Sequence, residues 1–447
     1  MEARVGLEED ILEEGKLTTK SWKRDDVGGG KSWTVGRFLN QFFHMTGRMK
    51  KLIWLAGDRK RPAFLSRNMF HTNQMLSATR IRDSFLSGTL CALLAAKCQS
   101  GKTGTFQSLI RQMLDAADVT HAYILCGSSE TELKKQAVED TRAANGDYYD
   151  AGLIEVIFHQ DFKHAKLDVV NALIIVDESH MVQTKGQQLH LFLATYGIFL
   201  DGNPKTLEEK NAYLLSVDAT PYSEIAALRE EETLFPKHVE ELEPGMGYYG
   251  LAEYERDGAL LPTFPIAKAP ERFESLLLDV GSKYVLLRLN RSEANRENEA
   301  VLRSICRARG FPVLLYTGEK TEIAVTRAEQ KRFARSGRKI GCLEDAPAVT
   351  TVVIVRGRLR AGKVVPKQHV GFVWEGASKS KTDALVQGLV GRMCGYVFGD
   401  QKPTLYVPVT ALVPDELGLV LCGDLPKTAT NLRASQMTNG KSVFSTA

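Results

Sequence analysis

The chain has 447 residues, of which 43% are hydrophobic and 25% charged, and its formal net charge is +4. This length is too great for one hydrophobic core and predicts roughly two or three domains. No apolar run approaches the about 18 residues of a membrane span, and the acidic stretch after Met1 does not resemble a secretory signal. Seven cysteines without a C-x-x-C pair predict reduced thiols in the cytoplasm or nucleus, and they argue against disulfides or zinc.

Residues 1–60 are interpreted as a partly flexible N-terminal extension, because an acidic piece is followed there by the run Gly28, Gly29 and Gly30. Charge is distributed unevenly beyond it. Residues 44–82 carry nine Lys and Arg against one acid, and residues 320–367 carry twelve against four. Two basic segments favour a bound polyanion, although ordinary solvated helix faces explain the charge alone equally well.

A phosphate-binding loop is predicted after the apolar run 89–95. The sequence Ala-Lys-Cys-Gln-Ser-Gly-Lys-Thr at 96–103 precedes a helix-like pattern, and a strand that leads into a helix N-terminus is the geometry that cradles phosphates. Lys102 supplies a point charge and Thr103 a hydroxyl for Mg²⁺. The predicted nucleotide-binding residues are Ala96, Gln99, Ser100, Gly101, Lys102, Thr103 and Gly104. The alternative is a surface loop that happens to contain Ser-Gly-Lys-Thr. Lys102 is expected to face solvent when the loop is empty.

Gln74 precedes this loop by about 27 residues. A glutamine amide offers a donor and an acceptor that match an adenine edge, so Gln74 is included among the nucleotide-binding candidates. A capping or surface role is the competing interpretation.

Two carboxylates follow a second apolar strand, at 173–176. Asp177 and Glu178 come at its carboxyl end, where parallel α/β sheets bind ligands. Asp177 is predicted to hold Mg²⁺ and Glu178 to polarise the attacking water. An acidic turn after a strand is common, but both motifs together, in this order, predict an ATPase.

Further strands are predicted at 121–126, 154–158 and 214–217, alternating with helices. Alternation of this kind predicts a parallel sheet with helices on both faces, which we assign to a first domain at 61–225. A hydroxyl-containing stretch, Ser-Val-Asp-Ala-Thr-Pro at 216–221, ends the last of these strands.

The three motifs at 96–103, 177–180 and 216–221 resemble motifs one, two and three of superfamily 2 helicases and translocases. The Asp-Glu-x-His form of motif two and the Ala-Thr-Pro form of motif three are specific when they occur together. The resemblance implies an α/β fold of two tandem RecA-like parallel-sheet domains. It also implies that His180, Ser216 and Thr220 couple the nucleotide state to the grip on nucleic acid, although a lone histidine is more often structural.

A change of composition marks residues 226–270 as a connecting segment between the domains. A second domain at 271–447 is predicted from strands near 284–289, 312–316, 349–355, 370–374 and 404–409. Helices are expected at 292–309 and 326–335. The second domain has no phosphate loop of its own, as the resemblance requires.

The stretch 387–396 resembles motif six, which presents arginine fingers across the domain cleft. Gln387 is predicted to contact nucleotide and Arg392 to stabilise transition-state charge. Gly395 and Tyr396 stand where a second arginine is usual. The second arginine is expected to be Arg356, Arg358 or Arg360. The alternative is that these residues contact the nucleic-acid backbone, and Lys363 is assigned to the same predicted nucleic-acid-binding group.

The sequence therefore predicts a helicase or translocase that hydrolyses ATP with Mg²⁺ between two RecA-like domains. Its predicted partner is nucleic acid, with DNA favoured over RNA, together with replication, repair, restriction or transcription proteins and no membrane. Enzymes of large DNA viruses, phages and restriction-type systems look similar. The alternatives are a translocase that remodels complexes without separating strands, a catalytically weak scaffold subunit, and a motor coupled to a nuclease on another chain.

Overall fold

The structure of the protein is a computed structural model. It describes residues 70–129, 131–179, 187–199, 204–219, 221, 224–225, 237–289, 292–317, 343, 346–356, 365–376, 388–396, 398 and 401–408. The predicted N-terminal extension and the predicted helix at 326–335 lie outside these residues. In the described ranges, no helix is long and apolar enough to cross a membrane.

A first sheet contains six parallel strands in the order β3-β2-β4-β5-β1-β6. The strands are β1 (Cys91–Ala96), β2 (His121–Cys126), β3 (Ile154–Phe158), β4 (Ala172–Asp177), β5 (Tyr213–Asp218) and β6 (His238–Leu242). The central strands are apolar and almost wholly buried, as strands covered on both faces must be. One strand, β5, separates the strand before the phosphate loop from the strand that ends in Asp177.

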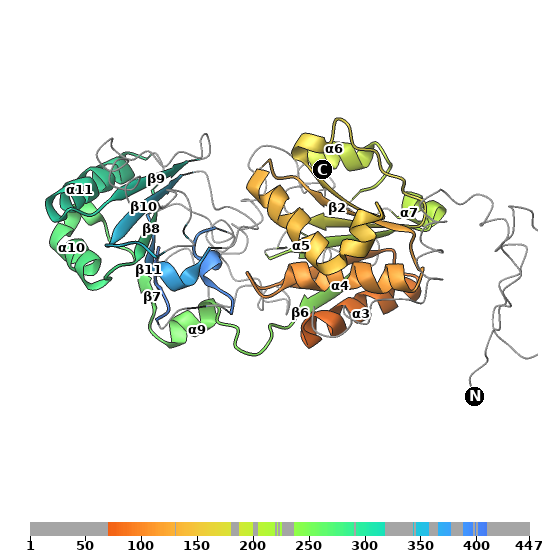
Figure 1. Ribbon diagram of the computed structural model, residues 1–447, viewed down its shortest axis with the longest axis horizontal. Helices are drawn as coiled ribbons and strands as arrows, with labels where there is room; N and C mark the ends of the chain where they lie inside the picture. The colour runs from red at the N-terminus through yellow and green to blue at the C-terminus, as the bar shows by residue number, and fades with distance from the viewer. Residues whose placement is uncertain are drawn as a thin grey trace, which may run out of the picture. The chain divides into compact units, whose positions relative to one another are not determined.

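Helices cover both faces of this sheet (Figure 1). The helices α3 (Thr72–Leu86), α4 (Lys102–Asp115) and α5 (Thr131–Asp150) pack on the face that carries Leu94, Ile124 and Leu215. On the opposite face, α6 (Gln188–Ala194) and α7 (Lys205–Lys210) pack against Tyr123 and Ile174. A short 3-10 helix, η2 (His159–Asp161), follows β3. Alternating residues of each strand therefore contribute side chains to two separate apolar layers, one on each face of the sheet.

A second sheet also contains six parallel strands, in the order β7-β12-β11-β8-β10-β9. The strands are β7 (Leu260–Pro262), β8 (Tyr284–Arg288), β9 (Val313–Thr317), β10 (Thr351–Arg356), β11 (Val370–Glu375) and β12 (Thr404–Val407). The helices are α9 (Leu251–Arg256), η4 (Ile266–Lys268), α10 (Pro270–Asp279), α11 (Glu293–Arg309), η5 (Lys367–His369) and η6 (Gly391–Met393).

The second sheet is likewise covered on both faces. The helices α10 and α11 pack on the side of Val285 and Trp374, whereas α9 and the segment around η6 pack on the side of Leu286 and Val373. Two tandem RecA-like parallel-sheet domains are the predicted fold class, and this prediction is confirmed.

The segment predicted to connect the domains contributes a strand to each sheet. Its strand β6 extends the first sheet beside β1, and its strand β7 extends the second sheet beside β12. Between them Tyr249 pairs with Gly395 in an antiparallel bridge, in which the Tyr249 N–H donates to Gly395 O (2.9 Å) and the Gly395 N–H to Tyr249 O (3.0 Å). From residue 249 onward the segment is therefore attached to the second sheet.

Candidate nucleotide-binding site

The loop between β1 and α4 turns through two left-handed residues, Gln99 (φ 58°) and Gly101 (φ 115°). The Ser100 N–H donates to Lys97 O (3.2 Å), and the Thr105 N–H donates to Gly101 O (3.1 Å), which starts the helix. A tight loop that ends at the N-terminus of a helix is an anion-binding arrangement. Ser100 Oγ is buried here without a hydrogen-bond partner among the described residues, which suits a ligand that accepts or donates a hydrogen bond.

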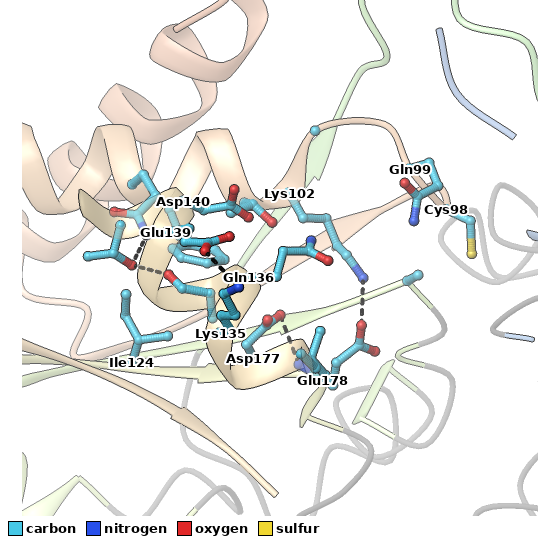
Figure 2. A pocket seen from close by; sticks show the side chains of 18 of the residues that line it. Cys98, Gln99, Lys102, Ile124, Lys135, Gln136, Glu139, Asp140, Asp177 and Glu178 are labelled. Carbon is cyan, nitrogen blue, oxygen red and sulfur yellow. Dashed lines mark hydrogen bonds and ion pairs between the residues drawn. The ribbon is translucent and has the colours of Figure 1, made fainter. Parts of the chain in front are cut away.

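Lys102 is the first residue of α4, and its amine lies 3.9 Å from Glu178 Oε1. The side chains of Lys102 and Glu178 are only 14% and 6% exposed. The prediction that Lys102 faces solvent is therefore wrong, because the carboxylate at the end of β4 attracts the amine into the fold. Figure 2 shows the Lys102 side chain extending toward Glu178, with Asp177 beside it.

Backbone strain is found at the second of the two carboxylates. Glu178 adopts φ 55°, a left-handed conformation that is uncommon for a residue other than glycine, and its N–H donates to Asp177 Oδ1 (3.0 Å). Strain of this kind persists where the surroundings over-determine the conformation, and it is concentrated at functional sites.

An excess of negative charge surrounds the lysine. Burial raises the pKa of Asp177 to about 7, and the charge of Glu178 adds to this effect. Burial alone would lower the pKa of Lys102, but the charges of Glu178, Asp218 and Asp177 outweigh it and the pKa is raised. One buried ammonium thus faces three carboxylates, and a further cation at Asp177 would relieve the imbalance.

These side chains line a cavity of about 660 Å³. From the first sheet it is lined by the phosphate loop, the start of α4, the start of α5, Asp177 and Glu178; from the second, by Pro366 and Arg392. The predicted metal ligands Thr103 and Asp177 are both among the lining residues. No three His, Cys, Asp or Glu side chains converge as a metal site within the described part of the chain. A Mg²⁺ ion held by one carboxylate, a hydroxyl and phosphate oxygens does not require such a cluster, so the residues fit this ion.

Gln74 contacts the phosphate loop directly. Its amide Nε2 donates to Gly101 O (3.1 Å), and its Oε1 accepts from the His71 N–H (3.0 Å). A Cβ atom on Gly104 would come within 2.5 Å of Gln74 Cδ, so both glycines of Gly-Lys-Thr-Gly are needed for this approach. Gln74 is therefore packed against the phosphate loop. The contact of Gln74 with adenine stays a prediction.

The second sheet contributes Arg392, which lies in η6 and is buried. Tyr396, at the position expected for a second arginine, donates from its hydroxyl to Ser100 O (2.9 Å) and accepts from the Gly245 N–H (2.8 Å). Tyr248 similarly donates to Cys98 O (2.7 Å). Tyr396, which departs from the motif-six pattern, and Tyr248 of the connecting segment thus hold the backbone of the phosphate loop, a role that local sequence does not reveal.

Of the three predicted coupling residues, His180 and Thr220 lie outside the described residues. Ser216 is buried in β5, and its hydroxyl has no hydrogen-bond partner among the described residues. A different serine joins the end of β4 to the end of β5. Ser179 Oγ lies 3.4 Å from Asp218 Oδ2 and 3.3 Å from Glu224 Oε2.

The carboxylate of Glu224 also forms an ion pair with Lys237 (Oε1 to Nζ, 2.8 Å), and both side chains are almost wholly buried, at 0% and 1% exposure. This network was not predicted. Ser179 is 39 residues from Asp218 and 45 from Glu224 in the sequence, and the only local signal was the polar residues at the ends of the two strands.

The predicted residues Gln387, Arg358, Arg360 and Lys363 lie outside the described residues. Arg356 is described, and it forms an ion pair with Glu299 and donates from Nε to Leu289 O (3.3 Å). In the other basic segment, Arg80 pairs with Glu240 and Arg82 with Asp118. These three arginines therefore have carboxylate partners inside the protein.

No protein-family model matches the chain. An uncharacterized protein of Acanthamoeba polyphaga mimivirus is 23% identical over 330 residues, which are 70% of this chain and 78% of that protein. Among solved structures, the chain is similar to Dbp5 of S. cerevisiae bound to RNA and ADP BeF3, with a TM-score of 0.43 and 12% identity over 89% of this chain and 92% of that one.

Two further solved structures are similar. The DEAD-box helicase Mss116 bound to ssRNA and UDP-BeF has a TM-score of 0.44 and 12% identity over 92% of this chain and 84% of that one. The DUF1998 helicase MrfA bound to DNA has a TM-score of 0.46 and 13% identity, and it covers 85% of this chain and 50% of that one. Each of these similarities is one of fold alone.

Proposed function

We propose that this protein is an ATP-dependent nucleic-acid helicase or translocase that hydrolyses ATP between its two sheets. The observation that carries the proposal is the common cavity: Lys102, Thr103, Asp177 and Glu178 line it from the first sheet, and Arg392 lines it from the second. An enzyme of this class needs groups from both domains around the terminal phosphate.

In the proposed mechanism the phosphates of ATP bind over the loop 97–101 and at the N-terminus of α4. The terminal phosphate draws the Lys102 ammonium away from Glu178, which leaves that carboxylate able to orient a water and accept its proton. Arg392 stabilises the charge that develops on the transferred phosphoryl group. Mg²⁺, held by Thr103 and Asp177, would supply charge neutralisation on the phosphate oxygens when it is bound.

The nucleic-acid partner is proposed from the motifs and from the two basic segments, most of whose residues lie outside the described part of the chain. DNA is the expected track. Binding would rest largely on phosphate contacts and would weaken steeply with salt.

The decisive experiment is steady-state ATP hydrolysis with no polymer, single-stranded DNA, duplex DNA and single-stranded RNA, at low and moderate salt. Stimulation by one polymer is expected, and a strand-separation assay beside a translocation assay then distinguishes a helicase from a remodelling translocase. Absence of turnover under every condition would contradict the enzyme and favour a scaffold subunit.

Two variants test the site itself. Lys102→Ala should abolish turnover because the terminal phosphate loses its cation, whereas Glu178→Gln should still bind ATP and fail to hydrolyse it. Full activity of Lys102→Ala would refute the assignment of the loop.

A further inference from the structure

Lys367 is a buried lysine that no described carboxylate neutralises. It begins η5 in the second sheet domain and is only 5% exposed. Within the described ranges its amine has neither an ion-pair partner nor a hydrogen-bond acceptor, and its aromatic neighbour is Phe398, with the ring centroid 5.5 Å from Nζ. Burial of an ammonium group without a partner is costly, and an anionic ligand beside it would offset that cost.

The amine lies where the phosphate loop meets the second sheet. Gly395 (φ 122°) marks this point: a Cβ atom placed on it would stand 3.2 Å from Lys367 Nζ, 3.2 Å from Gln99 Cβ and 3.4 Å from Gln99 O. Only a glycine allows these three groups to approach one another so closely. The residue before Lys367, Pro366, lines the same cavity as Lys102 and Arg392.

The surroundings of Lys367 disfavour its charged form. Burial lowers the pKa of Lys367, the charge of Arg392 lowers it further, and only the Cys394 thiol acts in the other direction. Lys367 and Arg392, both from the second sheet domain, therefore influence one another electrostatically. An anion bound between them and the loop would stabilise both.

Of the three arginines predicted as a second finger, the one within the described residues is already engaged. Arg356 forms an ion pair with Glu299, and Tyr396 occupies the motif-six position where superfamily 2 enzymes carry a second arginine and binds Ser100 O instead.

We propose that Lys367 is a further catalytic residue, which contacts the terminal phosphate of ATP from the second sheet and acts there with Arg392. The inference rests on the proposed function. It extends that function by adding a lysine, beside the arginine Arg392, to the groups of the second sheet domain that contact the phosphate. A lysine acts as a point charge rather than a planar fork, so it stabilises charge without fixing the orientation of the phosphate oxygens.

The test compares Lys367→Ala and Lys367→Arg with the control Lys402→Ala. Lys402 is an exposed lysine of the same sheet domain, with its Nζ 3.4 Å from the ring centroid of Tyr249. Equilibrium binding of ADP and of a non-hydrolysable ATP analogue is measured for each variant, together with kcat and KM for ATP.

A contact with the terminal phosphate predicts that Lys367→Ala binds the ATP analogue roughly 10-fold more weakly while its affinity for ADP is unchanged. Its kcat should fall by roughly 10²-fold, as for other groups that stabilise transition-state charge. Lys367→Arg should recover part of the loss, and Lys402→Ala should match the wild type.

Equal weakening of ADP and ATP binding, or an unchanged ratio of the two affinities, would overturn the assignment and leave Lys367 a structural residue. If Lys367→Ala does not fold, Lys367→Met keeps the aliphatic stem and is measured in the same way. Failure of the proposed function itself is distinguishable, because the wild type would then neither bind nor hydrolyse ATP.

Discussion

Replacing Glu224 by glutamine tests the buried network behind Glu178. Glu224 pairs with Lys237 at 2.8 Å, and neither side chain has appreciable contact with solvent. Glu224→Gln keeps the shape of the side chain but leaves a buried ammonium facing a neutral amide. Removal of one partner of a buried ion pair typically destabilises a protein by about 3–5 kcal/mol, because the remaining charge has lost its compensation.

Such a loss should lower the thermal midpoint of the first sheet domain by about 10 °C, at the few degrees per kcal/mol that domains of this size show. The assay is thermal unfolding followed by circular dichroism. In the double variant Glu224→Gln with Lys237→Met, no charge is left behind, so at least half of the loss should be recovered. The control is Asp150→Asn. Asp150 forms an ion pair with Arg142, and the side chains of Arg142 and Asp150 are 56% and 69% exposed. The effect of this substitution on the free energy of unfolding should stay within about 0.5 kcal/mol.

The same variant should impair catalysis. Ser179 lies between Glu224 and Asp218 and directly follows Glu178, whose left-handed backbone costs about 1–2 kcal/mol. Loosening Ser179 releases that constraint, so kcat should fall while the affinity for ATP changes little. A Glu224→Gln variant as stable and as active as the wild type would refute the reasoning.

Three further perturbations have defined outcomes. Arg392→Ala should lower kcat by roughly 10²-fold or more in steady-state hydrolysis, and an unchanged rate would show that the motif-six alignment is displaced. Gly104→Ala should weaken ATP binding through its clash with Gln74, and the double variant with Gln74→Ala should relieve the clash, as thermal shift with and without nucleotide would report. Burial raises the pKa of Glu375 from 4.5 to about 7 even though Arg288 lies 3.4 Å away. The folded chain therefore holds this proton more tightly than the unfolded chain, and stability should fall by about 3 kcal/mol as pH rises from about 4.5 to 7. Glu375→Gln should flatten this part of the stability profile, and an unaltered profile would contradict the assignment.

Local patterns were sufficient to predict the elements that carry the site. The strands expected at 121–126 and 154–158 have those bounds, and the strands before the phosphate loop and the Asp-Glu pair are displaced by one or two residues at most. Apolar runs that end in glycine, hydroxyl or acidic residues encode both the strand and the place of the ligand at its carboxyl end.

Long-range contacts were beyond such patterns. The strand β6 has the sequence His-Val-Glu-Glu-Leu, and it lies within the stretch 226–270 that its change of composition marks as a connecting segment. Glu240 becomes buried there because Ser77 and Arg80 of α3 satisfy its carboxylate. The contact of Tyr396 with the phosphate loop joins residues 296 positions apart, and no local periodicity reports it.

The bridge between Tyr249 and Gly395 limits the length of chain that joins the two sheets. Since β6 belongs to the first sheet up to Leu242 and the chain is attached to the second sheet domain from Tyr249 onward, the connection consists of residues 243–248. Gly247 supplies its left-handed turn (φ 84°), and the Gly245 N–H in the same connection donates to the Tyr396 hydroxyl, which itself donates to Ser100 O of the phosphate loop. One phenol group therefore joins the short connection between the sheets to the phosphate loop.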